Sequence, residues 1–194
     1  MKTGYNMTAN SEKEKISHNR VRDMAYTALF AVVIAVCSWI SVPFVIPFTL
    51  QTFAVFCAVL ILGSKRSFLS VLVYMLMGVV GLPVFSGFNS GFGALFGITG
   101  GYIIGFLFIP VSYMIFTYAF DNKTFVKILG LIVGLAVCYA FGTLWFVYVY
   151  SSTKGTISII SALSTCVFPY IVPDMIKLFL AFSVSKALQK HIKI

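Results

Sequence analysis

The sequence predicts an all-α integral membrane protein in which six transmembrane helices form one bundle with both termini in the cytoplasm. Of its 194 residues, 60% are hydrophobic and only 10% are charged, and the mean hydropathy of +1.00 lies far above that of soluble domains. The apolar residues form continuous runs, which favour helices over the alternating pattern of a membrane β-barrel. The basic residues gather at the ends of these runs, which indicates a defined orientation in the membrane.

The chain begins with a polar segment, residues 1–21, that predicts a mobile cytoplasmic arm with an interfacial helix near residues 16–22. We expect no cleaved signal peptide, because the segment shows no short apolar core followed by a cleavage site. One transmembrane domain is expected over residues 22–190, and residues 191–194 form a C-terminal tail.

Six apolar runs predict the spanning helices of this domain. Pro43 and Pro47 bracket a short turn after the first run, and residues 157–167 predict a helical loop before the last. The second run is short for a span unless it is only partly embedded. The runs cover residues 23–42, 48–62, 67–82, 100–120, 126–150 and 170–188.

The basic residues support this topology. With the N-terminus inside, 12 of the 14 Lys and Arg residues fall on the cytoplasmic side. Lys154 falls in an outer loop, and Lys177 lies within the sixth run. A net charge of +9 also occurs in nucleic-acid-binding proteins, but the dispersal of these residues favours the lipid bilayer as partner and no nucleic acid. All four cysteines lie in apolar runs without metal-site spacing, so reduced buried thiols and no metal are expected.

The segment from Leu82 to Tyr102 contains six glycines and no charge. Glycine lets the backbone approach a ligand closely, and irregular backbone at membrane depth is tolerated where it lines a cavity. We interpret the segment as one wall of a binding pocket facing the outside. The alternative is a plain external loop whose glycines serve tight turns.

Asp174 and Lys177 lie three residues apart in the sixth run, on one face of a helix, beside a proline, Pro173, that can start a helical turn. Ionisable groups at membrane depth usually face the bundle interior. We interpret the two residues as a ligand clamp; a structural ion pair or a snorkelling lysine is the alternative. Gln51 and Asn89 are isolated amides at the same predicted depth, which favours a ligand site over purely structural hydrogen bonds.

The ligand implied by these groups is small and partly apolar, with a hydrogen-bonding head and an optional anionic tail. Four aromatic residues are candidates to pack its apolar part: Trp39, Phe44, Phe85 and Tyr102.

Small residues follow one face of the first run, with Ala31 and Ala35 one turn apart. Such a face allows a second helix to approach closely in lipid, either within the bundle or from a partner protein. An enzyme is not expected, because both histidines lie in the tails and no nucleophile–base pair or metal cluster is visible. The chain also lacks the Gly-x-x-x-x-Gly-Lys-Ser/Thr motif that binds ATP phosphates.

Three stretches carry a family resemblance: VPFVIPFTLQTFAV, GLPVFSGFNSGFGALFGITGGYIIGF and FPYIVPDMIKLFLAF. They resemble the BioY family, the biotin-specific S components of energy-coupling-factor (ECF) vitamin transporters, over residues 22–190. The chain departs from the usual family pattern at Ile98, where proline is usual, and at Pro173, where glycine is common. Neither departure removes a polar side chain of the proposed site.

The resemblance implies that the ligand is biotin, which has a ureido head, an apolar ring and a carboxylate tail. It implies that Asp174 accepts hydrogen bonds from the ureido N–H groups and that Lys177 donates to the ureido oxygen, with Asn89 and Gln51 nearby. The opposite orientation of the ligand, with Lys177 on the carboxylate, remains open. The groups available to the other end of biotin are Tyr102, Ser90, Phe85 and the backbone of Gly91 and Gly93.

The resemblance also implies partners and a location. Ala31 and Ala35 would contact a transmembrane coupling subunit, and two cytoplasmic ATPase subunits would supply the energy. The chain itself would bind no cofactor and would be a multi-pass protein of a bacterial plasma membrane. Two alternatives keep the fold: an S component for another vitamin, or a biotin transporter that acts without the ATPases.

Overall fold

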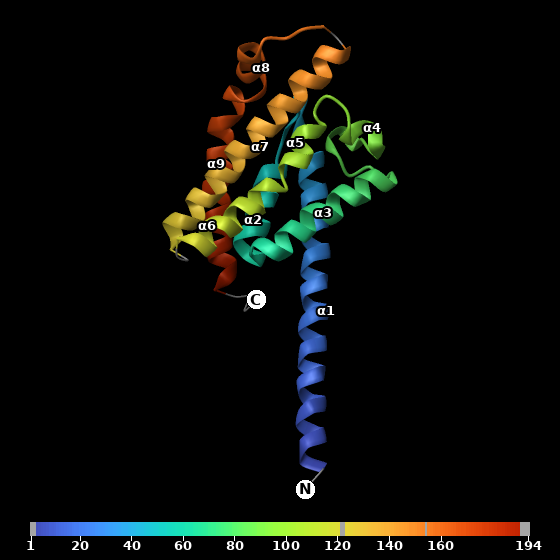
Figure 1. The fold of residues 1–194 in the computed structure, drawn as a ribbon, viewed down its shortest axis with the longest axis vertical. Helices are drawn as coiled ribbons and strands as arrows, with labels where there is room; N and C mark the ends of the chain where they lie inside the picture. The colour runs from blue at the N-terminus through green and yellow to red at the C-terminus, as the bar shows by residue number, and fades with distance from the viewer. Residues whose placement is uncertain (1–2, 121–122, 154, 191–194) are drawn as a thin grey trace.

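A computed structural model describes residues 3–120, 123–153 and 155–190, and the predicted C-terminal tail at 191–194 lies outside the described residues. The helices pack into one bundle, and the N-terminal half of the first helix projects away from it (Figure 1). The elements in chain order are α1 (Thr3–Trp39), β1 (Ser41–Val42), β2 (Phe48–Thr49), α2 (Gln51–Leu62), α3 (Ser64–Val80), η1 (Ser86–Phe88), α4 (Gly91–Leu95), α5 (Gly100–Gly105), α6 (Phe108–Ala119), α7 (Thr124–Thr153), α8 (Ile159–Cys166) and α9 (Phe168–Gln189).

Four helical stretches of the described chain are long and apolar enough to cross a membrane: Asn19–Trp39, Gly100–Ala119, Thr124–Thr153 and Ile159–Gln189. They confirm a helical membrane protein, whereas the count of six spans stays a prediction. α2 has 12 residues, which reach about 18 Å at about 1.5 Å per residue. That is well short of a hydrocarbon core about 30 Å thick.

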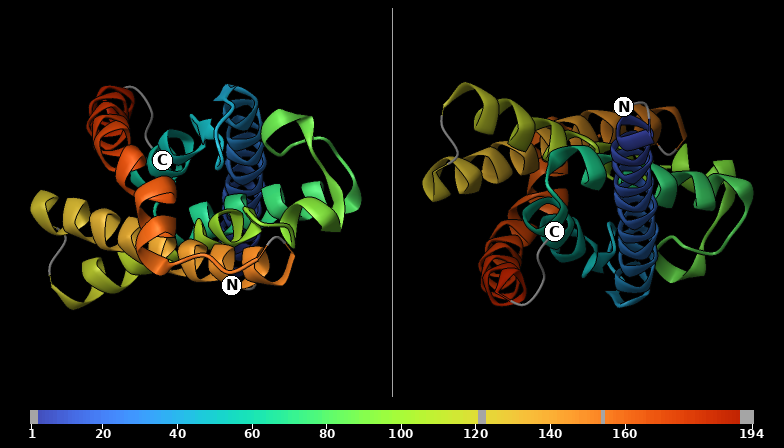
Figure 2. Two further views of the ribbon diagram at one scale, coloured as in Figure 1. Left: turned by 90° about the horizontal axis from the view of Figure 1, so that it is seen from above. Right: turned by 90° about the horizontal axis from the view of Figure 1, so that it is seen from below.

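A short hairpin replaces the outer part of the predicted second span. β1 pairs with β2 in antiparallel register, with Val42 opposite Phe48, and residues 43–47 form the predicted turn. α2 therefore begins only at Gln51. The end-on views place α2 between α1 and α9 (Figure 2). Most of its residues are buried, which is expected of a helix that is apolar on all sides and central to a bundle.

The first helix differs from its prediction at its N-terminal end. α1 runs without interruption from Thr3 to Trp39, so residues 3–21 of the predicted mobile arm continue the first span as helix, and residues 1–2 lie outside the described residues (Figure 1). The predicted interfacial helix near residues 16–22 is part of the same helix. The cytoplasmic location of this segment stays a prediction.

The predicted partner contact through Ala31 and Ala35 does not fit the structure. Ala31 is fully buried and Ala35 is 4% exposed, and both belong to the hydrophobic core. They lie on the side of α1 that packs against α2 and α3. In this arrangement a partner helix has no access to either side chain. The small residues serve close packing within the bundle, which was the alternative interpretation.

The packing of α5 against α7 depends on glycine. A Cβ atom at Gly142 of α7 would lie 2.3 Å from the ring of Tyr102 on α5. A Cβ atom at Gly101 would lie at the same distance from the Cβ of Trp145. Both positions therefore require glycine for the helices to approach this closely. The contact fixes the Tyr102 ring, which faces the cavity described below.

The last helix begins earlier than predicted. α9 starts at Phe168, with Pro169 in its first turn and Pro173 inside the helix. Pro173 was expected beside the start of a helical turn, and Pro169 takes that position instead. Asp174 and Lys177 follow five and eight residues after Pro169, and both are buried in the helix, which packs against α2.

Candidate ligand-binding site

Two adjoining cavities lie where the hairpin and α2 meet the glycine-rich segment, α5, α7 and α9. The larger has a volume of about 460 Å³ and the smaller about 50 Å³. They share Ile46, Pro47 and Thr49 of the hairpin region, together with Tyr102 and Phe106. Five predicted site residues line the larger cavity, namely Gln51, Asn89, Ser90, Gly93 and Tyr102. Three line the smaller cavity, namely Tyr102, Asp174 and Lys177.

The Asp174 carboxylate is held by three helices. Its Oδ1 accepts hydrogen bonds from Thr52 Oγ1 of α2 at 2.9 Å and from Lys177 Nζ of α9 at 2.8 Å. Its Oδ2 accepts a hydrogen bond from the Tyr139 hydroxyl of α7. Asp174 as a whole is 2% exposed. Burial of a carboxylate is tolerated where the group is paired and hydrogen-bonded, and both conditions are met here.

Lys177 uses its ammonium group to join α9 to the hairpin. Nζ donates to the Thr49 carbonyl at 2.7 Å and to Thr52 Oγ1 at 3.1 Å, besides its contact with Asp174. It also lies 4.1 Å from the centre of the Phe48 ring, where the negative face of the ring attracts a cation. All three N–H donors therefore point to protein atoms. The predicted ion pair forms, and it lies at the wall of the smaller cavity.

Gln51 reaches the larger cavity from the start of α2. Its Nε2 donates to the Tyr74 hydroxyl of α3 at 2.7 Å. The Tyr74 ring packs edge-on against Phe85, with ring centres 5.6 Å apart. Phe85 is 1% exposed and is not among the residues that line the two cavities. Its predicted contact with the ligand is therefore replaced by a packing role behind Tyr74.

The glycine-rich segment forms one wall of the larger cavity. Asn89 donates from Nδ2 to the Ser86 carbonyl at 2.8 Å, and its side chain lies at the wall of the cavity. Ser90 lies next to it, before α4. Gly93 lines the cavity, whereas Gly91 does not; Gly91 has φ +82°, a conformation that glycine adopts readily.

Two of the aromatic candidates lie away from the cavities. Trp39 stacks on Phe88 with ring centres 5.2 Å apart, and its Nε1 donates to the Pro83 carbonyl at 2.8 Å. Phe44 is largely exposed at the hairpin turn. Tyr102 is the aromatic candidate that lines both cavities, and its hydroxyl is hydrogen-bonded to Thr143 Oγ1 at 3.0 Å.

Sequence reasoning missed Thr52, Tyr139 and Tyr170. Thr52 and Tyr139 hold the Asp174 carboxylate, and the Tyr170 hydroxyl donates to the Ile46 carbonyl of the hairpin turn. Each is a hydroxyl inside or beside an apolar run, the same signal that selected Gln51. The signal is weak in tyrosine and threonine, because both residues are also common in purely apolar packing.

We expect Tyr139→Phe to lower the free energy of unfolding by about 1–3 kcal/mol, because it removes one donor from a buried carboxylate. The measurement is the thermal unfolding of the purified chain in detergent. Tyr148→Phe is the matched control, since Tyr148 lies on the same helix with 74% of its surface exposed. Equal melting temperatures for the two variants would contradict the role assigned to Tyr139.

Comparison with known proteins identifies relatives of this chain. The BioY family model matches residues 7–194. The probable biotin transporter BioY of Pyrococcus horikoshii is 36% identical over 171 residues, which cover 88% of this chain and 98% of that protein. The biotin transporter BioY of Thermotoga maritima is 37% identical over 175 residues, or 88% and 97% of the two chains.

The chain belongs to the BioY family.

The fold agrees with that of a solved relative. The crystal structure of the S component for biotin from an ECF-type ABC transporter superposes with a TM-score of 0.76 at 25% identity, over 90% of this chain and 94% of that one. The family resemblance found in the sequence is thus confirmed. BioY proteins are transporter components, so the expectation that the chain is not an enzyme is also confirmed.

Proposed function

We propose that the chain captures biotin at the outer face of a bacterial plasma membrane and delivers it inward as the substrate-specific subunit of an ECF-type transporter. The observation that carries the proposal is the buried Asp174–Lys177 pair at the wall of a cavity. A paired carboxylate and ammonium offer an acceptor and a donor side by side, which matches a ureido group. The names of the relatives and of the solved structure support biotin over other ligands.

In the proposed binding mode, the ureido N–H groups donate to Asp174 and the ureido oxygen accepts from Lys177. The apolar ring packs against Tyr102, and the carboxylate tail extends into the larger cavity toward Ser90 and the backbone of Gly93. Asn89 was expected beside the ureido group, but it lines this larger cavity and not the one beside Asp174. The adjoining volumes support this assignment, because a compact head and a longer tail need a small and a large compartment. The reversed orientation places the tail on Lys177 and the ureido group near Asn89.

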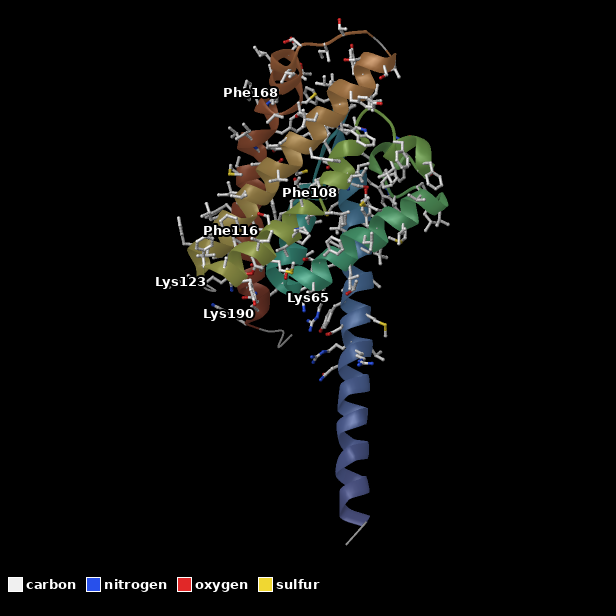
Figure 3. The ribbon with its side chains drawn as sticks, in the orientation of Figure 1. Lys65, Phe108, Phe116, Lys123, Phe168 and Lys190 are labelled. Carbon is white, nitrogen blue, oxygen red and sulfur yellow. The ribbon has the colours of Figure 1, made fainter. Side chains whose placement is uncertain are left out.

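The proposed orientation has six spans with both termini in the cytoplasm. Lys65, Lys123 and Lys190 lie at one end of the bundle, and Phe168 lies near the other (Figure 3). Basic residues at one end support a cytoplasmic placement of that end. The cavities then lie toward the outer side, where the hairpin and the glycine-rich segment meet.

Energy coupling in this proposal comes from partner subunits. A transmembrane coupling subunit and two cytoplasmic ATPases hydrolyse ATP, and the biotin-loaded chain reorients in the membrane to release its ligand inside. Support comes from the solved structure, whose protein belongs to an ECF-type ABC transporter, and from the absence of an ATP-phosphate motif in the sequence.

The test is equilibrium binding of biotin to the purified chain in detergent, with thiamine and riboflavin as competitors, followed by uptake into proteoliposomes. We expect tight binding of biotin alone, and uptake only when the coupling subunit, the ATPases and ATP are present. Binding of another vitamin in place of biotin would overturn the proposed specificity. Biotin uptake by the chain alone would favour a transporter that acts without the ATPases.

A further inference from the structure

An apolar groove lies between α3 and α6, apart from the two cavities of the candidate site. Its volume is about 320 Å³, at the lower end of the range of about 300–1,000 Å³ seen for small-molecule sites. The walls are the apolar side chains Phe68 and Leu69 of α3 and Val111 and Met114 of α6. Leu69 and Met114 are exposed, so the groove opens on the outer surface of the bundle.

A lysine without an ion-pair partner among the described residues lines this groove. Lys65 lines the groove, and within the described residues it makes no hydrogen bond or ion pair. Its neighbour Arg66 is paired with Asp23 of α1 at 2.9 Å, so the ammonium of Lys65 is the free charge at this position. Figure 3 shows Lys65 at the basic end of the bundle. Ser64, at the start of α3, adds a hydroxyl to the same end of the groove.

A groove with apolar walls and a cation beside them fits a ligand that has both an apolar chain and a negative charge. Apolar walls that face lipid accept acyl chains, and a basic residue at the membrane surface attracts an anionic headgroup. A zwitterionic headgroup offers no net charge to Lys65, and a soluble anion offers nothing to the apolar walls. We propose that the α3–α6 groove is a binding site for an anionic phospholipid, with an acyl chain between Leu69 and Met114 and the phosphate at Lys65.

Native mass spectrometry of the full chain in a neutral detergent tests this site. The probes are dioleoyl phosphatidylglycerol and dioleoyl phosphatidylcholine at equal concentration, which share acyl chains and differ in charge. We expect Lys65→Gln to reduce retention of phosphatidylglycerol about fivefold, since one basic residue near an anionic surface contributes roughly that factor. Lys65→Arg should retain the lipid, because the charge is kept.

Two further variants test whether lipid retention depends on the groove itself or on the loss of any positive charge. Met114→Trp fills the groove without changing the charge and should also reduce phosphatidylglycerol retention. Lys186→Gln removes an exposed lysine of α9 that does not line the groove, and it should leave retention unchanged. An equal loss in Lys186→Gln, or no loss in Lys65→Gln, would overturn the proposal. Full competition by glycerol 1-phosphate would overturn it as well, since that anion carries no acyl chain.

The proposals for the lipid site and for the biotin site can be tested independently. Lys65 lies outside both cavities of the candidate site, so biotin affinity should be the same in Lys65→Gln and the unmodified chain. Loss of biotin binding in this variant would show that the groove residues support the fold of the biotin site, which would also overturn an independent lipid site.

Discussion

Replacing Asp174 with alanine is expected to weaken biotin binding by about two to four orders of magnitude. The substitution removes the acceptor proposed for the ureido group and leaves the ammonium of Lys177 without its charged partner. Removing one member of a buried pair costs about 3–5 kcal/mol, and each factor of ten in affinity corresponds to about 1.4 kcal/mol. Isothermal titration of biotin into the purified chain in detergent measures the change directly.

Asp23→Ala is the matched control for this experiment. Asp23 is also an aspartate of a described helix with a basic partner, Arg66, at 2.9 Å. It lies outside both cavities, so its loss should leave biotin affinity unchanged. Tight binding that survives Asp174→Ala would keep biotin as the ligand and reassign Asp174 to the stability of the bundle.

Lys177→Met is expected to destabilise the chain by about 3–5 kcal/mol, because it leaves Asp174 as an unpaired charge in an apolar interior. The double variant Asp174→Asn/Lys177→Met carries no charge at this place. It should regain most of the lost stability, since Thr52 and Tyr139 can still bond the amide. Neither variant should bind biotin tightly.

Thermal unfolding of Asp174→Asn, Lys177→Met, the double variant and the unmodified chain forms a double-mutant cycle that isolates the pair. Lys186→Met is the control for the loss of a lysine, because Lys186 is an exposed residue of the same helix. A double variant that is less stable than Lys177→Met would mean that the two residues contribute independently. In that case, stability in this region would depend on each residue's own bonds to α2 and the hairpin.

Hydropathy alone predicted most of the helices and drew attention to the charged pair. Helices followed from apolar runs, and Asp174 and Lys177 stood out because charge is rare inside such runs. The length of α2 was not predictable in this way. Residues 48–62 form one apolar run, but the β1–β2 pairing takes the first residues of the run into the hairpin and delays the helix to Gln51.

The direction in which individual side chains point was harder to predict from the sequence. Ala31 and Ala35 form a small-residue face that fits a partner helix or a neighbour in the same chain equally well, and α2 and α3 occupy it here. Phe85 lies in the segment that forms the cavity wall, yet its ring points into the core against Tyr74. Such choices depend on helices distant in sequence, which a local pattern does not include.

The bond from Lys177 to the Thr49 carbonyl bears on how a bound ligand leaves. Thr49 belongs to the hairpin that walls both cavities. When a ligand oxygen binds the ammonium of Lys177 in place of the Thr49 carbonyl, one hydrogen-bond acceptor replaces another. The number of hydrogen bonds that Lys177 donates therefore stays the same. When the ligand departs, the backbone carbonyl is at hand to restore the original contact, and no bare ammonium remains in the membrane. In the proposed transport cycle we therefore expect the Thr49 carbonyl to lower the barrier to ligand release, so that the hairpin influences how fast biotin leaves as well as how tightly it binds.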